Sequence, residues 1–317
     1  MTDIFDRIRE SCADVAQRST HVSINRDGLE RFASTLDITP PQPDPGQIRI
    51  GDDESSAAFI LALDSINFGS GYFPYMRKRE GMSGYHTVAT SLRDFVAEGG
   101  PITVSRLVEM DPGRCAAVFG QSIDEPMQAE LMSLFSQALL DLAHFVTTNG
   151  NGSFLNVIDS VHGSAAAMVE LLDRMPFFHD VHSHGGAEVL LFKRAQIVVQ
   201  DLAVAFQHEG PGRFHDIDRL TMFADNLVPH VLRVEGVLEF APELLARIER
   251  VDDITVGSDP EVEIRACALH AVELLRDALV ERGVGISSAD LDNILWNLGA
   301  APRYKSVLRH RSRCVFY

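Results

Sequence analysis

The chain has 317 residues, of which 45% are hydrophobic and 23% are charged, and its formal net charge at pH 7 is -17. These proportions are typical of a globular protein, and no run approaches the ~20 apolar residues that a membrane-spanning helix needs. So negative a charge disfavours duplex DNA or RNA as a partner, because neutralising their phosphates requires a broad basic face. A single nucleotide remains compatible with it.

The N-terminus is amphipathic and lacks the apolar core of a signal peptide, so we expect a cytoplasmic protein with no membrane partner. The four cysteines lie far apart and form no C-x-x-C pair. Neither a zinc site nor a disulfide framework is therefore expected, and we expect no cofactor.

Helical periodicity dominates the chain. Helices are predicted at residues 2–17, 28–36, 54–66, 85–98, 127–147, 154–174, 189–207, 261–282 and 288–297. Segments rich in proline or glycine separate them, the longest at 38–47, and strand signals are short, as around Ile48 to Ile50. The chain is therefore predicted to be mostly α, a single irregular helical domain over 1–317 with minor short strands. Residues 1–50 either pack on this domain or form a lid.

The segment LALDSINFGSGYFP, residues 61–74, is a buried helix that runs into a turn rich in glycine and aromatic residues. Glycine lets a backbone approach a ligand closely, and aromatic rings stack on planar bases. A helix end with core aromatic residues explains the same pattern, so both interpretations stay open.

A run of possible metal ligands, His179, Asp180, His182 and His184, lies in a segment predicted to be a loop. Histidine and aspartate together are compatible with a metal site. This run gives an alternative function, a metal-dependent phosphohydrolase.

The predicted helix over 189–206 is apolar on nearly all sides, which indicates burial. Lys193 begins a polar stripe along it, and Asp201 lies on the adjoining stripe. A buried lysine must reach solvent, meet a carboxylate or lose its charge. Asp225, framed by apolar residues at a turn before Pro229, is a candidate partner. It is either a helix cap or a reactive group.

The last fifteen residues are basic in an acidic chain and contain no Asp or Glu. Arginine pairs with phosphate in a forked geometry, so the segment suggests a site for one localised anion. The alternative is a solvated tail, against which the interleaved aromatic residues argue.

Four motifs resemble those of the queuosine salvage proteins, also described as queuosine 5'-phosphate N-glycosylases. They are FKRAQIVVQDL at 192–202, MFADNLVPHVLRVEGVL at 222–238, EIRACALHAVELL at 263–275 and PRYKSVLRHRSRCVFY at 302–317. The similarity extends from about residue 60 to the end. It implies hydrolysis of the N-glycosidic bond of queuosine 5'-monophosphate, which releases queuine and ribose 5-phosphate. It also implies an all-helical architecture similar to that of helix-hairpin-helix DNA glycosylases.

The resemblance also implies roles for individual residues. Asp225 lies at the anomeric carbon, and Lys193 orients Asp225 or the water, or offsets charge on the substrate. The base and ribose are held by Asp64, Asn67, Phe68 and Asp201, and the phosphate by Tyr304, Lys305, Arg309, His310 and Arg311. A metal-dependent phosphohydrolase and a non-catalytic nucleotide-binding helical module remain the alternatives.

Overall fold

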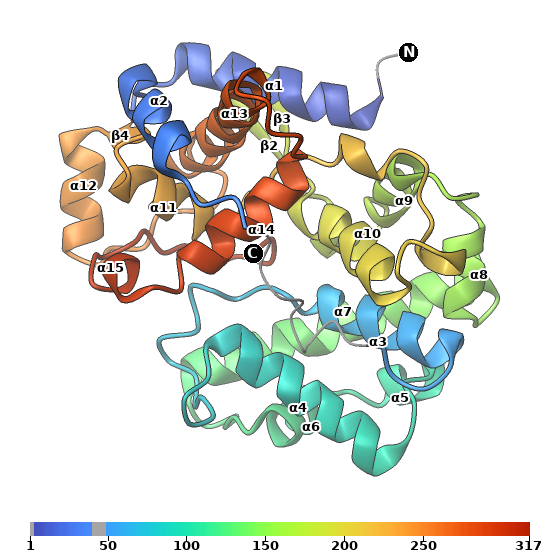
Figure 1. The fold of residues 1–317 in the computed structure, drawn as a ribbon. Coiled ribbons are helices and arrows are strands. Elements are labelled where there is room, and N and C mark those ends of the chain that lie inside the picture. The colour runs from blue at the N-terminus through green and yellow to red at the C-terminus, as the bar shows by residue number, and fades with distance from the viewer. Residues whose placement is uncertain (1–2, 40–48) are drawn as a thin grey trace. The chain divides into compact units, whose positions relative to one another are not determined.

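The computed structural model describes residues 3–39 and 49–317, which divide into two compact units. Each unit combines segments that are distant in the sequence. Helices make up most of both units and the strands are few and short, which confirms the mostly α prediction (Figure 1). No described helix combines the length and the apolar character required to cross a membrane.

Unit 1 comprises residues 1–42, 180–196 and 216–313. Its helices are α1 (Ile4–Arg18), α2 (Arg26–Thr35), α11 (Val228–Val234), α12 (Pro242–Glu249), α13 (Asp259–Glu281), α14 (Ser288–Leu298) and α15 (Pro302–Lys305). Two antiparallel pairs of strands complete it: β1 (Val22–Ile24) with β4 (Leu238–Phe240), and β2 (Val181–His184) with β3 (Ala187–Leu190).

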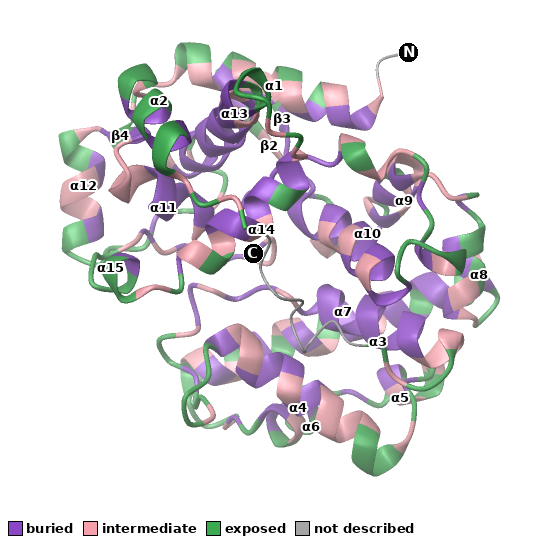
Figure 2. Ribbon diagram, viewed as in Figure 1, coloured by how far each residue is buried: buried purple, intermediate pink, exposed green. Residues whose placement is uncertain are grey.

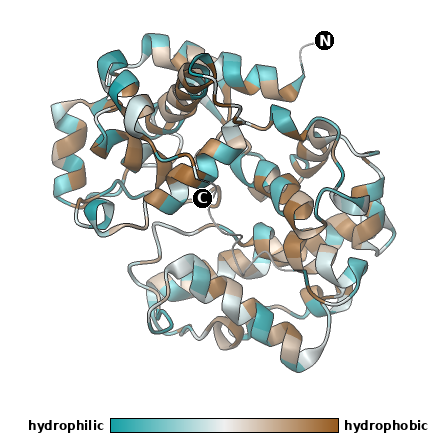
Figure 3. Cartoon of the chain, in the orientation of Figure 1, coloured by the Kyte–Doolittle hydropathy of each residue, from teal (hydrophilic) through white to brown (hydrophobic). Residues whose placement is uncertain are grey.

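Helix α13 is the centre of unit 1, because α1, α2, α11 and α14 all pack against it. Figure 2 colours most of its visible length as buried. Hydrophobic and hydrophilic positions alternate around α1 (Figure 3), whose apolar face includes Phe5, Ile8 and Val15. Burying such a face accounts for much of the stability of an amphipathic helix.

The buried carboxylate of Glu263 ties the N-terminal segment to α13. Its Oε2 accepts the backbone N–H groups of residues 20–22 at 2.6–3.1 Å, and its Oε1 is 3.0 Å from His184 Nε2. Residues 3–39 therefore pack within unit 1, whereas Arg49 and Ile50 belong to unit 2 and most of the proline-rich stretch at 38–47 lies outside the described residues.

Unit 2 comprises residues 43–179, 197–215 and 314–317. Its helices are α3 (Asp53–Ser65), α4 (Gly84–Gly99), α5 (Val104–Val108), α6 (Pro112–Phe119), α7 (Pro126–Gly150), α8 (Phe154–Asp159) and α9 (Ala165–Leu172), with short turns η2 (Pro176–Phe178) and η3 (Gly210–Gly212). The long α7 packs against α3, α5, α6 and α8. Helix α10 (Lys193–Ala205) begins in unit 1, and its residues from Ile197 onward belong to unit 2.

Two predicted helices have different bounds in the structure. The helix predicted at 154–174 is two helices, because His162 and Gly163 adopt positive φ angles of 51° and 72° that no α-helix tolerates. The helix predicted at 189–207 begins only at Lys193, since the preceding residues complete β3. The segment from His179 to His184, predicted to be a loop, ends in strand β2, and only Gly185 and Gly186 form the turn of the β2–β3 hairpin, both at positive φ as a tight hairpin requires.

Five short helices, α5, α6, α11, α12 and α15, were not predicted. Four of them carry a proline in their first turn. Proline breaks a helix interior but suits its first turn, where its missing N–H costs nothing. The strand suggested around Ile48 to Ile50 is wrong for Arg49 and Ile50, which lie in no strand, and Ile48 lies outside the described residues.

Candidate functional site

A buried ion pair between Asp180 and Arg265 lies in unit 1. Arg265, in α13, is fully buried and donates to the two Asp180 carboxylate oxygens at 2.6 and 2.9 Å. Burial alone would raise the pKa of Asp180, but the Arg265 guanidinium and His182 outweigh it and hold that pKa well below its usual range. A buried pair of this kind is stable only while both partners are present.

The run from His179 to His184 does not form a metal site. His182 Nε2 lies 2.9 Å from Asp180 Oδ1, and His184 contacts Glu263 as described above. In unit 2, His179 Nδ1 lies 2.7 Å from Asp173. Within residues 3–39 and 49–317 no three His, Cys, Asp or Glu side chains are grouped so that they could hold a metal ion. These four side chains therefore have other partners in the structure.

Asp225 lies in unit 1 on an irregular segment just before α11, and only 8% of it is exposed. Its Oδ1 accepts the backbone N–H groups of Leu227 at 2.7 Å and Val228 at 3.0 Å, so it caps the start of α11. The described residues donate no hydrogen bond to its second oxygen, Oδ2. The cap interpretation is confirmed, and one carboxylate oxygen stays available for chemistry.

Asp292, in α14, is a second buried carboxyl beside Asp225, and the sequence analysis missed it. Burial and the negative charge of Asp225 raise its pKa well above the ordinary value, while the Phe223 N–H and the Lys193 charge act in the opposite direction. The net effect favours the protonated, neutral form of Asp292. The charges of both Lys193 and Asp225 thus act on the Asp292 carboxyl group within unit 1. The predicted lysine–carboxylate site needs the first two residues to lie in one such neighbourhood.

Lys193 begins α10 and is 6% exposed. Its backbone N–H donates to Asp180 Oδ2 at 3.2 Å, which links the start of the helix to the buried ion pair. The fold thus fixes the backbone from which the lysine side chain extends.

Arg309 is a part-buried cation that makes no hydrogen bond or ion pair with the described residues. Burial lowers its pKa, the Asp225 carboxylate raises it and the neighbouring Arg311 lowers it. The Arg311 backbone is fixed, because its carbonyl accepts the Ile254 N–H at 2.7 Å. A guanidinium held near the Asp225 carboxylate without a hydrogen-bond or ion-pair partner among the described residues is suited to bind an anion.

The solvated-tail interpretation of this segment is wrong. Tyr304, His310 and Tyr317 are each at most 3% exposed. The Tyr304 hydroxyl donates to Glu235 at 2.6 Å, and its carbonyl accepts from His230 at 2.9 Å. The aromatic residues therefore hold the basic segment in place, although Lys305 is exposed.

His310 is buried, and its Nε2 has no hydrogen-bond partner among the described residues. Burial, followed by the charge of Arg309, lowers its pKa from 6.5 to about 3. The imidazole is therefore neutral at physiological pH and can donate one hydrogen bond.

This shift predicts a pH-dependent stability. Between pH 6.5 and about 3 the unfolded chain binds a proton on His310 that the folded chain does not bind. The contribution of His310 to the free energy of unfolding is therefore complete above pH 6.5. It decreases as the pH falls from 6.5 toward 3, by about 1.4 kcal/mol per pH unit. We expect His310→Asn to remove this part of the slope, measured by urea unfolding from pH 4 to pH 8. The curves of the two proteins should run parallel above pH 6.5, and parallel curves below it would contradict the assignment.

The residues predicted to bind the base and ribose lie in unit 2. Asn67 Nδ2 donates to Asp64 Oδ1 at 3.4 Å at the end of α3. Phe68 is 2% exposed and contacts Phe135 edge-on, with ring centroids 5.2 Å apart, so it is a core residue in this structure. Asp201 is 4% exposed in α10. Their binding roles stay predictions.

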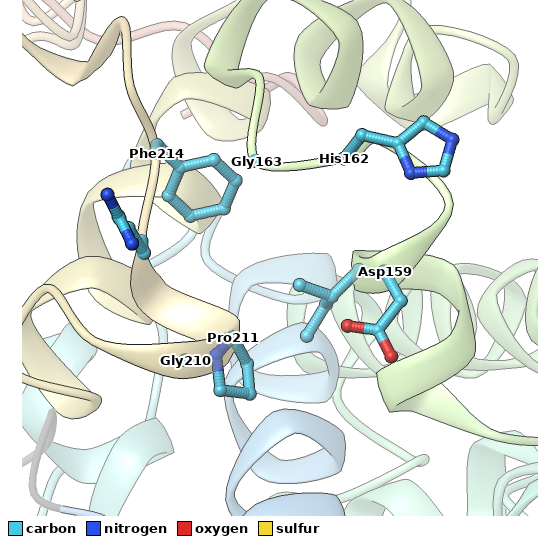
Figure 4. A pocket seen from close by; sticks show the side chains of 8 residues that line it. Asp159, His162, Gly163, Gly210, Pro211 and Phe214 are labelled. Carbon is cyan, nitrogen blue, oxygen red and sulfur yellow. The ribbon is translucent and has the colours of Figure 1, made fainter.

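A cavity of about 220 Å³ elsewhere in unit 2 contains none of the predicted residues. Figure 4 shows Asp159 and His162 on one side of it, with Phe214 and Pro211 across from them. The residues predicted to carry the chemistry therefore do not line this cavity.

Comparison with known proteins identifies the family. A model described as "Queuosine salvage protein" matches residues 48–317. The chain is similar to proteins named queuosine 5'-phosphate N-glycosylase/hydrolase: it is 33% identical to that of Sphaerobacter thermophilus over 100% of both chains, and 31% identical to that of Dictyostelium discoideum over 98% of both. The mouse protein of that name is 29% identical over 98% of both chains. The chain therefore belongs to the queuosine salvage protein family.

Proposed function

We propose that this chain hydrolyses the N-glycosidic bond of queuosine 5'-monophosphate and releases queuine and ribose 5-phosphate. The names of its relatives support this reaction. The observation that carries it for this chain is the pair formed by Asp225, which has one carboxylate oxygen available, and Arg309, a part-buried cation without a protein partner. The first suits a developing sugar cation and the second suits a phosphate.

Asp225 is the proposed catalytic residue. Cleavage of an N-glycosidic bond passes through an oxocarbenium-like state, with positive charge on the ribose and negative charge on the departing base. A fixed carboxylate stabilises that cation and activates the attacking water. Because the cap bonds hold Oδ1, the group is oriented before the substrate binds.

Lys193 is proposed to balance the two neighbouring carboxyl groups. Its positive charge acts on Asp292, which in turn interacts with Asp225. The lysine therefore limits the cost of keeping a carboxylate ionised in buried surroundings.

The basic segment is proposed to bind the 5'-phosphate. Arg309 and Arg311 supply charge, Lys305 adds a more exposed cation, and neutral His310 offers one hydrogen bond. Tyr304 contributes by anchoring the segment, since its hydroxyl is bonded to Glu235. Binding at the phosphate supplies energy that can be used at the distant reacting bond.

The 7-deazapurine base has no nitrogen at position 7 to protonate, so the protein must assist its departure through other atoms of the base. We assign this recognition to Asp64, Asn67 and Phe68, with Asp201 at the base or ribose. The similarity to helix-hairpin-helix DNA glycosylases, the single domain, the cytoplasmic location and the exclusion of duplex nucleic acid stay predictions.

A product assay tests the function. Purified protein is incubated with queuosine 5'-monophosphate or with the nucleoside queuosine, and free queuine is detected by mass spectrometry. We expect rapid release from the monophosphate and much slower release from the nucleoside. Binding without release would support a non-catalytic module instead.

Arg309→Gln tests the phosphate role. Charge-assisted hydrogen bonds contribute about 1.5–3 kcal/mol, so we expect kcat/KM for the monophosphate to fall ~10- to 100-fold and that for the nucleoside to change little. The matched control is Arg303→Gln, which removes an exposed arginine of the same segment that pairs with Glu235 and should leave both values unchanged. An equal loss with both substrates would contradict a phosphate contact.

A further inference from the structure

The segment that carries Asp225 is buried although it has no regular secondary structure. We call residues 221–226 the Asp225 loop; all six are buried, and none lies in a helix or strand. Within the described part of the chain it forms no backbone–backbone hydrogen bond. Buried N–H and C=O groups are costly unless they are bonded. Side chains from elsewhere in unit 1 must therefore hold this loop.

Asp292 and Arg265 hold its centre. Asp292 Oδ1 accepts the Phe223 N–H at 3.0 Å, and Arg265 Nε donates to the Ala224 carbonyl at 2.9 Å. Both side chains are buried, at 3% and 0% exposure. The two residues immediately before Asp225 are thus fixed from two helices, α14 and α13.

Gln196 of α10 holds the beginning of the loop. Its Oε1 accepts the Thr221 N–H at 2.8 Å, and its Nε2 donates to the Leu191 carbonyl at 3.1 Å. Its side-chain amide is therefore itself oriented. Side chains from the start of α10 and from α13 and α14 together define the path of the chain up to Asp225.

We propose that Asp292 is a positioning residue for the reaction: by holding the Phe223 N–H it sets the direction in which Asp225 presents its carboxylate. This inference rests on the proposed function, because it takes Asp225 as the group that meets the substrate. Misplacement of a reacting group by about 1 Å can cost ~10²-fold in rate. Asp292 acts on the substrate only through the loop.

The charge state of Asp292 fits this role. Burial and the charge of Asp225 raise its pKa, and Lys193 acts against them. Helices α11 and α13 and the turn η4 (Ile217–Arg219) also pack against α14, and the ionisable groups that they carry include His230, Arg233, Glu261, Arg265 and Arg219. In its protonated form Asp292 keeps an acceptor oxygen for the Phe223 N–H without adding a second negative charge beside Asp225. Ionisation at high pH would add that charge.

Two substitutions separate the bond from the charge. Asp292→Asn keeps a neutral acceptor oxygen, whereas Asp292→Leu keeps the branching at Cγ, is larger and has no acceptor. We expect Asp292→Asn to retain kcat within about threefold at pH 7, and Asp292→Leu to lose ~10²-fold in kcat with KM for queuosine 5'-monophosphate nearly unchanged. Asp290→Asn, an exposed position on the same helix, is the matched control and should behave as wild type.

The pH profile gives a second readout that a purely structural role would not change. As the pH rises past the pKa of Asp292, kcat of the wild type should fall while kcat of Asp292→Asn stays level. This comparison needs only the wild type and Asp292→Asn. It therefore tests the positioning role even where Asp292→Leu does not fold.

The outcomes distinguish failure of the positioning role of Asp292 from failure of the proposed function. Queuine release by the wild type and an equal kcat for Asp292→Leu would overturn the positioning role and leave the proposed function standing. Identical pH profiles of kcat for the wild type and Asp292→Asn would overturn it as well. If neither the wild type nor Asp290→Asn releases queuine, the proposed function fails and this inference fails with it.

Discussion

Asp225→Asn should lower kcat for queuosine 5'-monophosphate by ~10²- to 10³-fold and leave substrate binding largely intact. The amide removes the negative charge that stabilises the oxocarbenium-like state, and losses of this order are typical when an electrostatic contact to a transition state is removed. Asparagine keeps an oxygen that can accept the Leu227 and Val228 N–H groups, so the cap of α11 persists. Single-turnover release of queuine, with the Kd measured by calorimetry, checks both parts.

The matched control for this change is Asp111→Asn. Asp111 also caps a helix, since its Oδ1 accepts the Arg114 N–H at 2.7 Å at the start of α6, but it is exposed in unit 2. It should keep full activity. A kcat for Asp225→Asn within tenfold of the wild type would show that Asp225 serves only as a cap.

Arg265→Met should destabilise the protein by about 3–5 kcal/mol, because it leaves Asp180 charged, buried and without its ion-pair partner. The substitution also removes the bond from Arg265 to the Asp225 loop. Denaturant unfolding at pH 7 measures the change. Arg250→Met is the control: Arg250 pairs with Asp252 at the surface, where such pairs contribute at most about 1 kcal/mol.

A double variant sharpens this test. Replacing both partners, in Arg265→Met with Asp180→Leu, removes the uncompensated charge and should recover much of the lost stability. If Arg265→Met alone costs no more than Arg250→Met, the buried pair does not stabilise unit 1.

Local sequence patterns predicted the long helices and the anchored basic segment, because periodicity and composition act over short distances. The prolines misled the prediction, because proline ends helices in some places but stands in the first turn of others. It does so in α6, α11, α12 and α15. The break at His162 and Gly163 depends on two positive φ angles that composition does not reveal.

Only part of the proposed site could be predicted from the sequence. Lys193, Asp225 and the basic segment stand out as polar residues in apolar or acidic surroundings. Arg265 and Asp292 gave only a weak signal, because a charged residue in an otherwise apolar helix usually faces solvent. Their importance depends on contacts with residues 180 and 223, which lie 85 and 69 positions away. Such pairings follow from the tertiary fold.

The interleaved construction of unit 1 affects how the protein is made. Residues 20–22 bond to Glu263, up to 243 positions later in the chain, and α1 packs against the same helix. During synthesis the apolar face of α1 therefore stays exposed until α13, the helix that covers it, has been synthesised. Exposed apolar surface of this kind favours aggregation and chaperone binding, and contacts between such distant residues slow folding. The yield of active protein on expression should therefore depend more on chaperone supply and temperature than on the thermodynamic stability of the finished fold.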